Sequence, residues 1–181
     1  MTPRVKALLE RAAVALRSAE STPLLEEIGA ADVGLPELLQ HLRAKEGWQE
    51  EEAWTTPSFR ASLFLMPAGG TMPLHDHPGM DALLKVLWGQ IRIRSYDWME
   101  GQQALARATS DRLVSPADGA QRLEPHRDNL HRLDAVEDSA FLDLLAPDYD
   151  VEAGRPCLYY VEEALVATEG GPSIRLRPVP T

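Results

Sequence analysis

From Ser58 onward the chain consists of short apolar runs separated by clusters of glycine, proline and aspartate. In residues 59–65 and 91–94, apolar side chains recur at every second position, the pattern of a strand with one face in a core and the other in water. Similar runs cover residues 130–136, 140–145, 158–161 and 174–177. Because no helical periodicity separates them, this part of the chain predicts about ten antiparallel strands in a β-sandwich or small barrel.

The N-terminal part of the chain shows helical rather than strand periodicity. Residues 2–18 predict an amphipathic helix, because apolar side chains recur three and four positions apart. Thr2 is a suitable N-cap, and Pro3 is favoured in a first helical turn. Two shorter helices are expected, one ending near Gly29 and one beginning near Pro36.

A boundary between the two patterns falls near residue 55. Residues 49–52, Gln-Glu-Glu-Glu, are interpreted as an acidic link that joins the helices to the strands. We therefore expect residues 1–55 to form a helical segment that packs on a barrel of residues 56–181. The whole chain is expected to fold as one compact domain.

The acidic composition argues against some classes of binding partner. The chain has 28 acidic and 18 basic residues, and its formal net charge of −10 argues against nucleic acid and against an anionic membrane surface. The single cysteine excludes an intrachain disulfide, and no apolar stretch approaches the ~18 residues of a membrane span. We expect a soluble, cytoplasmic protein that acts as a monomer.

The strongest functional signal is the pair of histidines in His75-Asp76-His77. Pro73 and Pro78 disfavour a helix here, so the segment is predicted to be extended. Alternate side chains of a strand share a face, and the two imidazoles would then form half of a metal site. The same spacing also occurs in polar surface strands and in buried, hydrogen-bonded histidine pairs.

A catalytic metal needs a third protein ligand, and the sequence offers three candidates. Asp81 follows His77 by four residues, His126 lies in a predicted loop, and His131 lies at the start of a predicted strand. We favour His131, because a sheet that rolls up returns a later strand beside the first pair. Ligation by Asp81 would instead give three histidines and a carboxylate, a set that also suits Mn, Ni or Zn.

Several ordered motifs resemble one family. Residues 73–80, Pro-Leu-His-Asp-His-Pro-Gly-Met, and residues 83–89, Leu-Leu-Lys-Val-Leu-Trp-Gly, closely resemble the thiol dioxygenases that include cysteamine (2-aminoethanethiol) dioxygenase and the plant cysteine oxidases. Asn-Leu-His at 129–131 is similar to the family's Asn-x-His, residues 141–149 to its Leu-Asp-x-Leu-x-Pro-Pro-Tyr, and residues 154–160 to its Gly-Arg-x-Cys-x-Tyr-Tyr. The resemblance covers residues 59–161.

This resemblance implies a cupin-type antiparallel barrel, or jelly roll, in which His75, His77 and His131 hold Fe(II). It implies a non-haem dioxygenase that adds both atoms of O2 to the sulfur of its substrate and releases a sulfinic acid. The implied substrate is a small aminothiol such as cysteamine, or a peptide with an N-terminal cysteine.

The resemblance also places Asp143 and Tyr149 near the substrate. Asp143 would attract the substrate amine, and Tyr149 would donate a hydrogen bond to bound oxygen or sulfur. Alternatively, Asp143 pairs with an arginine and Tyr149 packs a turn. Cys157 and Tyr159 are two positions apart, and some thiol dioxygenases carry a Cys–Tyr thioether; the alternative is an inert buried thiol beside an aromatic ring.

Two acidic residues beside the histidine pair are expected outside the ligand set. Asp76 alternates away from its histidine neighbours and is predicted to orient the turn or a ligand imidazole, or else to be a plain surface carboxylate. Asp81 departs from the family pattern. If it reaches the metal, the chain is a metal-dependent cupin of another activity, such as an isomerase or a carbon-substrate dioxygenase. A non-catalytic metal- or thiol-sensing module is a further alternative.

Overall fold

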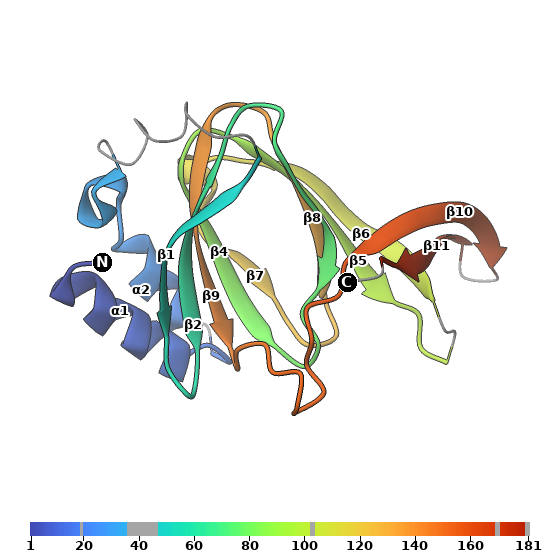
Figure 1. The fold of residues 1–181 in the computed structure, drawn as a ribbon, viewed down its shortest axis with the longest axis horizontal. Coiled ribbons are helices and arrows are strands. Elements are labelled where there is room, and N and C mark those ends of the chain that lie inside the picture. The colour runs from blue at the N-terminus through green and yellow to red at the C-terminus, as the bar shows by residue number, and fades with distance from the viewer. Residues whose placement is uncertain (19, 36–46, 102–103, 169–170, 180–181) are drawn as a thin grey trace.

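The computed structural model describes residues 1–18, 20–35, 47–101, 104–168 and 171–179, which form two antiparallel sheets with helices on one side (Figure 1). Helix α1 spans Pro3–Val14, α2 spans Ser21–Glu26, and the short 3₁₀ helices η1 and η2 span Ala30–Val33 and Pro116–Asp118. Thr2 caps α1 as predicted, because its hydroxyl accepts a hydrogen bond from the Val5 amide at 3.3 Å. The helix predicted from Pro36 falls at residues 36–46, outside the described residues.

The strands form two sheets that lie face to face. In spatial order, sheet A contains β1 (Gln49–Thr55), β2 (Arg60–Met66), β9 (Ser139–Ala146), β4 (Asp81–Trp88) and β7 (Gln121–Leu123). Sheet B contains β10 (Tyr160–Thr168), β11 (Gly171–Pro178), β6 (Leu105–Val114), β5 (Ile91–Trp98), β8 (Leu130–Ala135) and β3 (Thr71–Asp76). The predicted all-β jelly roll is confirmed, as an open two-sheet sandwich rather than a closed barrel.

Alternation along the strands divides the core into two layers. In β9, Phe141 points between the sheets, where it packs in one cluster with Ile93 of β5 and Leu133 of β8. Its neighbours Leu142 and Leu144 point the other way and pack in a second cluster that includes helix α1. Figure 1 shows the helices on this outer face of sheet A. The inner face of sheet B is therefore the surface on which His131, two residues before Leu133, is presented.

One buried lysine ties the helices to sheet A. Lys85 of β4 is 7% exposed, and its ammonium group donates hydrogen bonds to the carbonyls of Leu25, Glu26 and Ile28 at 2.9–3.1 Å. It also lies 3.2 Å from the Glu26 carboxylate. Because the last carbonyls of a helix have no partner within it, Lys85 satisfies the end of α2 and fixes the N-terminal segment on the sheet.

The prediction of an acidic link at residues 49–52 was wrong, since these residues belong to strand β1. Glu50 accepts hydrogen bonds from the Arg60 guanidinium of β2 at 2.7 Å on both carboxylate oxygens, and Trp54 packs edge-on against Phe59, with ring centroids 5.1 Å apart. Cross-strand pairing therefore outweighs the low strand propensity of glutamate. Sheet A begins at Gln49, before the expected boundary at residue 55.

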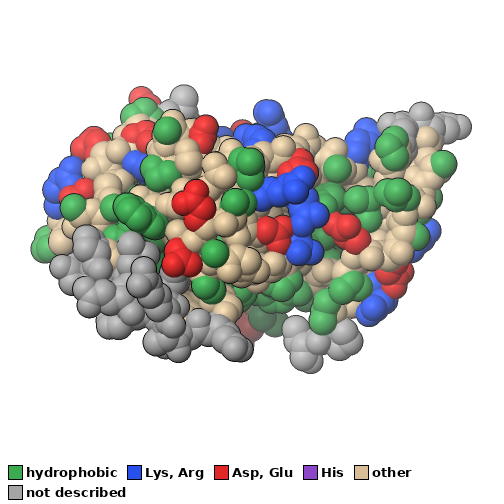
Figure 2. All heavy atoms as spheres, turned by 90° about the horizontal axis from the view of Figure 1, so that it is seen from above, with side chains coloured by type: hydrophobic (Ala, Val, Ile, Leu, Met, Phe, Trp, Pro, Cys, Tyr) green, Lys and Arg blue, Asp and Glu red, His purple; other side chains and the backbone are tan. Residues whose placement is uncertain are grey.

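Charges of both signs lie side by side on the surface seen in Figure 2. On sheet B, opposite charges form ion pairs, for example Arg92 with Asp111 and Arg94 with Asp134, each at 2.6 Å. Among the described helices, none is long and apolar enough to cross a membrane.

Candidate metal centre

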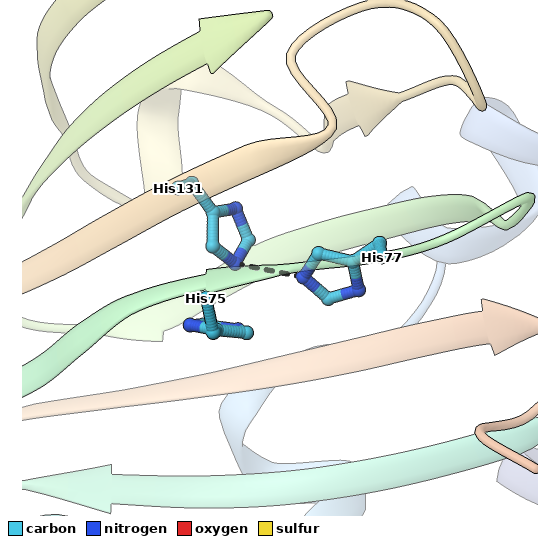
Figure 3. A group of neighbouring side chains, drawn as sticks. All are labelled: His75, His77 and His131. Carbon is cyan, nitrogen blue, oxygen red and sulfur yellow. Dashed lines mark hydrogen bonds between the residues drawn. The ribbon is translucent and has the colours of Figure 1, made fainter. Parts of the chain in front are cut away.

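His75, His77 and His131 converge inside the sandwich (Figure 3). One ring nitrogen from each lies within 4.8 Å of the other two, and each side chain is at most 5% exposed. His75 comes from β3, His77 follows the end of that strand, and His131 comes from β8. The third ligand predicted from the sequence is thus the one that the fold brings beside the pair.

Strand register explains how the remote histidine reaches the pair. In the antiparallel pairing of β3 with β8, His75 lies directly opposite His131. His77 lies just beyond the strand, and its backbone is held on both sides by Asn129: the His77 amide donates to the Asn129 carbonyl at 3.0 Å, and the Asn129 side-chain amide donates to the His77 carbonyl at 2.6 Å. Asn129, which is 4% exposed, therefore fixes the backbone that carries one imidazole.

On two of the rings Nδ1 donates a hydrogen bond to the protein, which leaves the lone pair on Nε2. His75 Nδ1 lies 2.8 Å from the Pro73 carbonyl, which only accepts, so this nitrogen carries the proton. The Tyr149 hydroxyl donates to the Asp76 carbonyl at 2.9 Å and so accepts from His77 Nδ1, also at 2.9 Å. In both rings the lone pair is on Nε2, the arrangement that metal-ligating histidines show when their other nitrogen donates to the protein.

The three imidazoles are neutral at physiological pH. Burial lowers the pKa of His75 to about 4, and burial together with the neighbouring rings holds the pKa values of His77 and His131 well below the ordinary value. His77 Nε2 and His131 Nε2 lie only 3.2 Å apart. Neutral imidazoles at this spacing are the ligands that a first-row transition metal prefers, and the donor set fits such an ion.

Asp76 supports the site from the opposite face of β3. Its carboxylate is 6% exposed and accepts hydrogen bonds from the Leu158 amide at 3.0 Å and from the Tyr160 hydroxyl at 2.8 Å. In the described part of the chain it forms no hydrogen bond with an imidazole, so the orienting role, which remains a prediction, would act through the backbone between the two histidines. The alternative of a plain surface carboxylate is wrong.

Asp81 and His126 lie away from the three-histidine cluster. Asp81 accepts from Arg17 Nε at 3.1 Å, and in β4 it shares a face with Leu83 and Lys85, which point toward the helices. The ligand set of three histidines and a carboxylate is therefore contradicted. His126 lies in a turn at the surface, in which the Arg127 backbone amide donates to the Glu124 carbonyl.

Asp143 lies on the inner face of sheet A, between Ser62 of β2 and Leu84 of β4 in the strand register. Burial raises the pKa of its carboxyl to about 7. The nearby Arg60 guanidinium is occupied by Glu50, and within the described residues no basic side chain lies within ion-pair distance of Asp143. The alternative in which Asp143 simply pairs with an arginine is not what the described residues show.

Tyr149, Cys157 and Tyr159 form a second group beside the histidines. Burial raises the pKa of the Cys157 thiol, and the neighbouring Tyr149 and Tyr159 side chains partly offset this rise. The Tyr159 ring lies 5.7 Å from the His75 ring, and the Tyr149 ring lies 5.6 Å from the His77 ring. Cys157 and Tyr159 are close enough to affect each other's pKa, and their thioether remains a prediction. Tyr149 has a contact with His77 that the sequence did not indicate.

Comparison with known proteins assigns this chain to a family. The PCO_ADO family model matches residues 24–175. This chain belongs to the PCO_ADO family. The 2-aminoethanethiol dioxygenase of Homo sapiens is 39% identical over 133 residues, which cover 59% of this chain and 49% of that protein. Plant cysteine oxidase 1 of Arabidopsis thaliana is 32% identical over 157 residues, which cover 77% of this chain and 53% of that protein.

This chain spans about half the length of these relatives. Among solved structures, KdgF from Halomonas sp. is similar at 26% identity with a TM-score of 0.43, covering 60% of this chain and 87% of that one. An RmlC-like cupin from Desulfovibrio desulfuricans is similar at 20% identity with a TM-score of 0.42, covering 56% and 83%. These scores are low, so the fold assignment rests on strand order and on the family.

Proposed function

We propose that this PCO_ADO member is a non-haem Fe(II) thiol dioxygenase that converts a small aminothiol, or an N-terminal cysteine, to its sulfinic acid. The observation that carries the proposal is the convergence of three buried imidazoles, His75, His77 and His131, in a chain of this family. When bound, Fe(II) supplies the positive charge that favours the substrate thiolate and the redox chemistry that delivers both atoms of O2 to sulfur.

The protein's own residues have separate tasks in this proposal. The three imidazoles stay neutral, so a bound ion keeps its full charge for the substrate. Tyr149 and the Pro73 carbonyl hold two of the rings in the Nδ1–H tautomer. Asp143 lies across the sandwich on sheet A, and burial raises the pKa of its carboxyl. We propose that Asp143 binds the substrate amine, because the positive charge of the amine would favour the carboxylate form.

The charges on the inner face of sheet A favour an amine over a carboxylate on the substrate. Arg60 lies on this face, but both oxygens of Glu50 occupy its guanidinium, and Asp148 lies 3.9 Å from it. A substrate carboxylate would meet Asp143 and these two acids and would have to displace Glu50 to reach the arginine. These charges favour cysteamine or a peptide N-terminus over free cysteine.

Oxygen uptake by the iron-loaded, reduced protein tests the proposal. We expect thiol-dependent O2 consumption with cysteamine or with a Cys-initiated peptide, and mass spectrometry should show a product that has gained two oxygen atoms. Free cysteine should be the poorer substrate. A protein that binds iron but shows no uptake with any of the three thiols would refute the activity and favour a non-catalytic metal-binding module.

The monomeric, cytoplasmic state expected from the sequence remains a prediction. The alternative of another metal-dependent cupin activity loses its main support, because Asp81 lies in an ion pair with Arg17 rather than beside the histidines.

A further inference from the structure

The strands that carry His75 and His131 are packed on both faces. Next to these ligands, Leu74 and Leu130 point to the outer face of sheet B, where they form a buried cluster with Leu176 of β11. The β10–β11 hairpin covers this cluster before it projects from the sandwich at the right of Figure 1. Most of β10 is exposed, so the base of the hairpin is the part that contacts the ligand strands.

The base of the hairpin also closes the free edge of β3. β3 is the last strand of sheet B, and its pairing with β8 shifts register between Met72 and His75. At its end, the Asp76 amide donates to the Leu158 carbonyl at 3.2 Å, and the Asp76 carboxylate accepts from the Leu158 amide at 3.0 Å and from the Tyr160 hydroxyl at 2.8 Å. Both carboxylate oxygens of Asp76 are thus committed to the segment that opens the hairpin.

We propose that Tyr160 is a positioning residue for the metal centre and that it acts through Asp76. Asp76 lies between two ligands in the sequence, so any displacement of its backbone turns both the His75 and the His77 ring. A metal ion tolerates little change in the direction of its ligands, and support from outside the ligand set commonly sets affinity. The inference rests on the proposed metal centre and adds the C-terminal hairpin to the parts that shape it.

The chain offers a matched control for a purely structural role of this hydroxyl. The Tyr96 hydroxyl of β5 donates to the Glu162 carboxylate at 2.6 Å and so also links sheet B to the hairpin. It does not contact Asp76. In Tyr160→Phe the ring keeps its edge-on contact with Trp98, at 5.2 Å between centroids, so only the hydrogen bond is removed.

The experiment measures the Kd for Fe(II) anaerobically, by competition with a chromophoric chelator, and records the visible spectrum of the Co(II)-loaded protein. We expect Tyr160→Phe to weaken Fe(II) binding by about 10-fold and to alter the Co(II) spectrum, and Tyr96→Phe to change the affinity by less than about two-fold. Asp76→Ala should weaken binding at least as much. Asp76→Asn should stay near wild type, because its amide still accepts from Leu158 and can donate to the Tyr160 oxygen.

The outcomes separate this inference from the proposed centre. A wild-type protein that binds neither Fe(II) nor Co(II) overturns the metal centre itself. A wild-type protein that binds both, with Tyr160→Phe unchanged in affinity and spectrum or with Tyr96→Phe equally weakened, overturns only the positioning role. If Tyr160→Phe fails to fold, Asp76→Ala and Asp76→Asn carry the test, and equal affinities for these two variants overturn the role.

Discussion

Replacing Tyr149 by phenylalanine removes one oxygen atom from the support of His77. In the wild-type protein that oxygen accepts from His77 Nδ1 at 2.9 Å and donates to the Asp76 carbonyl at 2.9 Å. A metal on Nε2 confines the imidazole proton to Nδ1. Tyr149→Phe therefore leaves a buried N–H without its acceptor whenever the metal is bound.

The size of the effect follows from where this penalty falls. A buried donor without a partner costs about 1–3 kcal/mol. The metal-free variant escapes this cost, because the proton can move to Nε2 and point at His131 Nε2, 3.2 Å away. The penalty is therefore carried by the metal-bound state alone, and it corresponds to metal binding that is about 5- to 150-fold weaker.

Anaerobic competition for Fe(II) against a chromophoric chelator measures this change, and Tyr159→Phe is the matched control. The Tyr159 ring also lies beside a ligand, but in the described part of the chain its hydroxyl forms no hydrogen bond to an imidazole. We expect the control to bind Fe(II) within about two-fold of wild type. If Tyr149→Phe binds equally well yet loses turnover, Tyr149 acts on bound oxygen or sulfur, and the tautomer argument is refuted.

Three other substitutions test separate parts of the structure. Lys85→Met removes the ammonium donor from the carbonyls of Leu25 and Glu26 in α2 and of Ile28 just beyond it, and urea unfolding should show a loss of about 3 kcal/mol in the free energy of unfolding; a loss below about 1 kcal/mol would contradict the anchoring of α2. Burial raises the pKa of Asp134, but hydrogen bonds from two arginines and a threonine outweigh it and hold the pKa at about 2. This stabilisation is present above about pH 4 and is lost as the pH falls toward 2. Asp134→Asn should thus be less stable than wild type by about 1–2 kcal/mol at neutral pH, after allowance for solvent screening, and a difference that persists at pH 2 would exclude an ionic origin. Asp81→Asn should keep the metal content of wild type, as measured by elemental analysis, because Asp81 pairs with an exposed arginine; loss of the metal would return Asp81 to the ligand set.

The metal ligands were predictable because each depends on a local rule. Alternation places His75 and His77 apart from Asp76, and a rolled antiparallel sheet brings a later strand beside the first. To choose His131 over Asp81 as the third ligand, one must know which face of β4 carries the Asp81 side chain. Residues 82–87 are buried throughout, so alternation in the sequence does not say which side chains point inward. Only the packing of Leu83 and Lys85 against the helices settles it.

The residues that support the ligands were harder to predict, because their contacts join distant parts of the chain. Tyr149 meets His77 across 72 positions, and Tyr160 meets Asp76 across 84. Asn129 could have been found, since it precedes His131 in the Asn-x-His motif. Its two hydrogen bonds to the His77 backbone, one from its side-chain amide and one to its own backbone carbonyl, depend on the strand register. The acidic strand β1 was missed because its stability comes from pairing with β2 rather than from its own composition.

The most direct test is diffraction from crystals of the Fe(II)-loaded protein, with an anomalous difference map at the iron absorption edge. We predict a single peak inside the sandwich at bonding distance from the Nε2 atoms of His75, His77 and His131. A peak elsewhere, or iron bound to the first two histidines with the His131 ring turned away, would contradict the proposed centre.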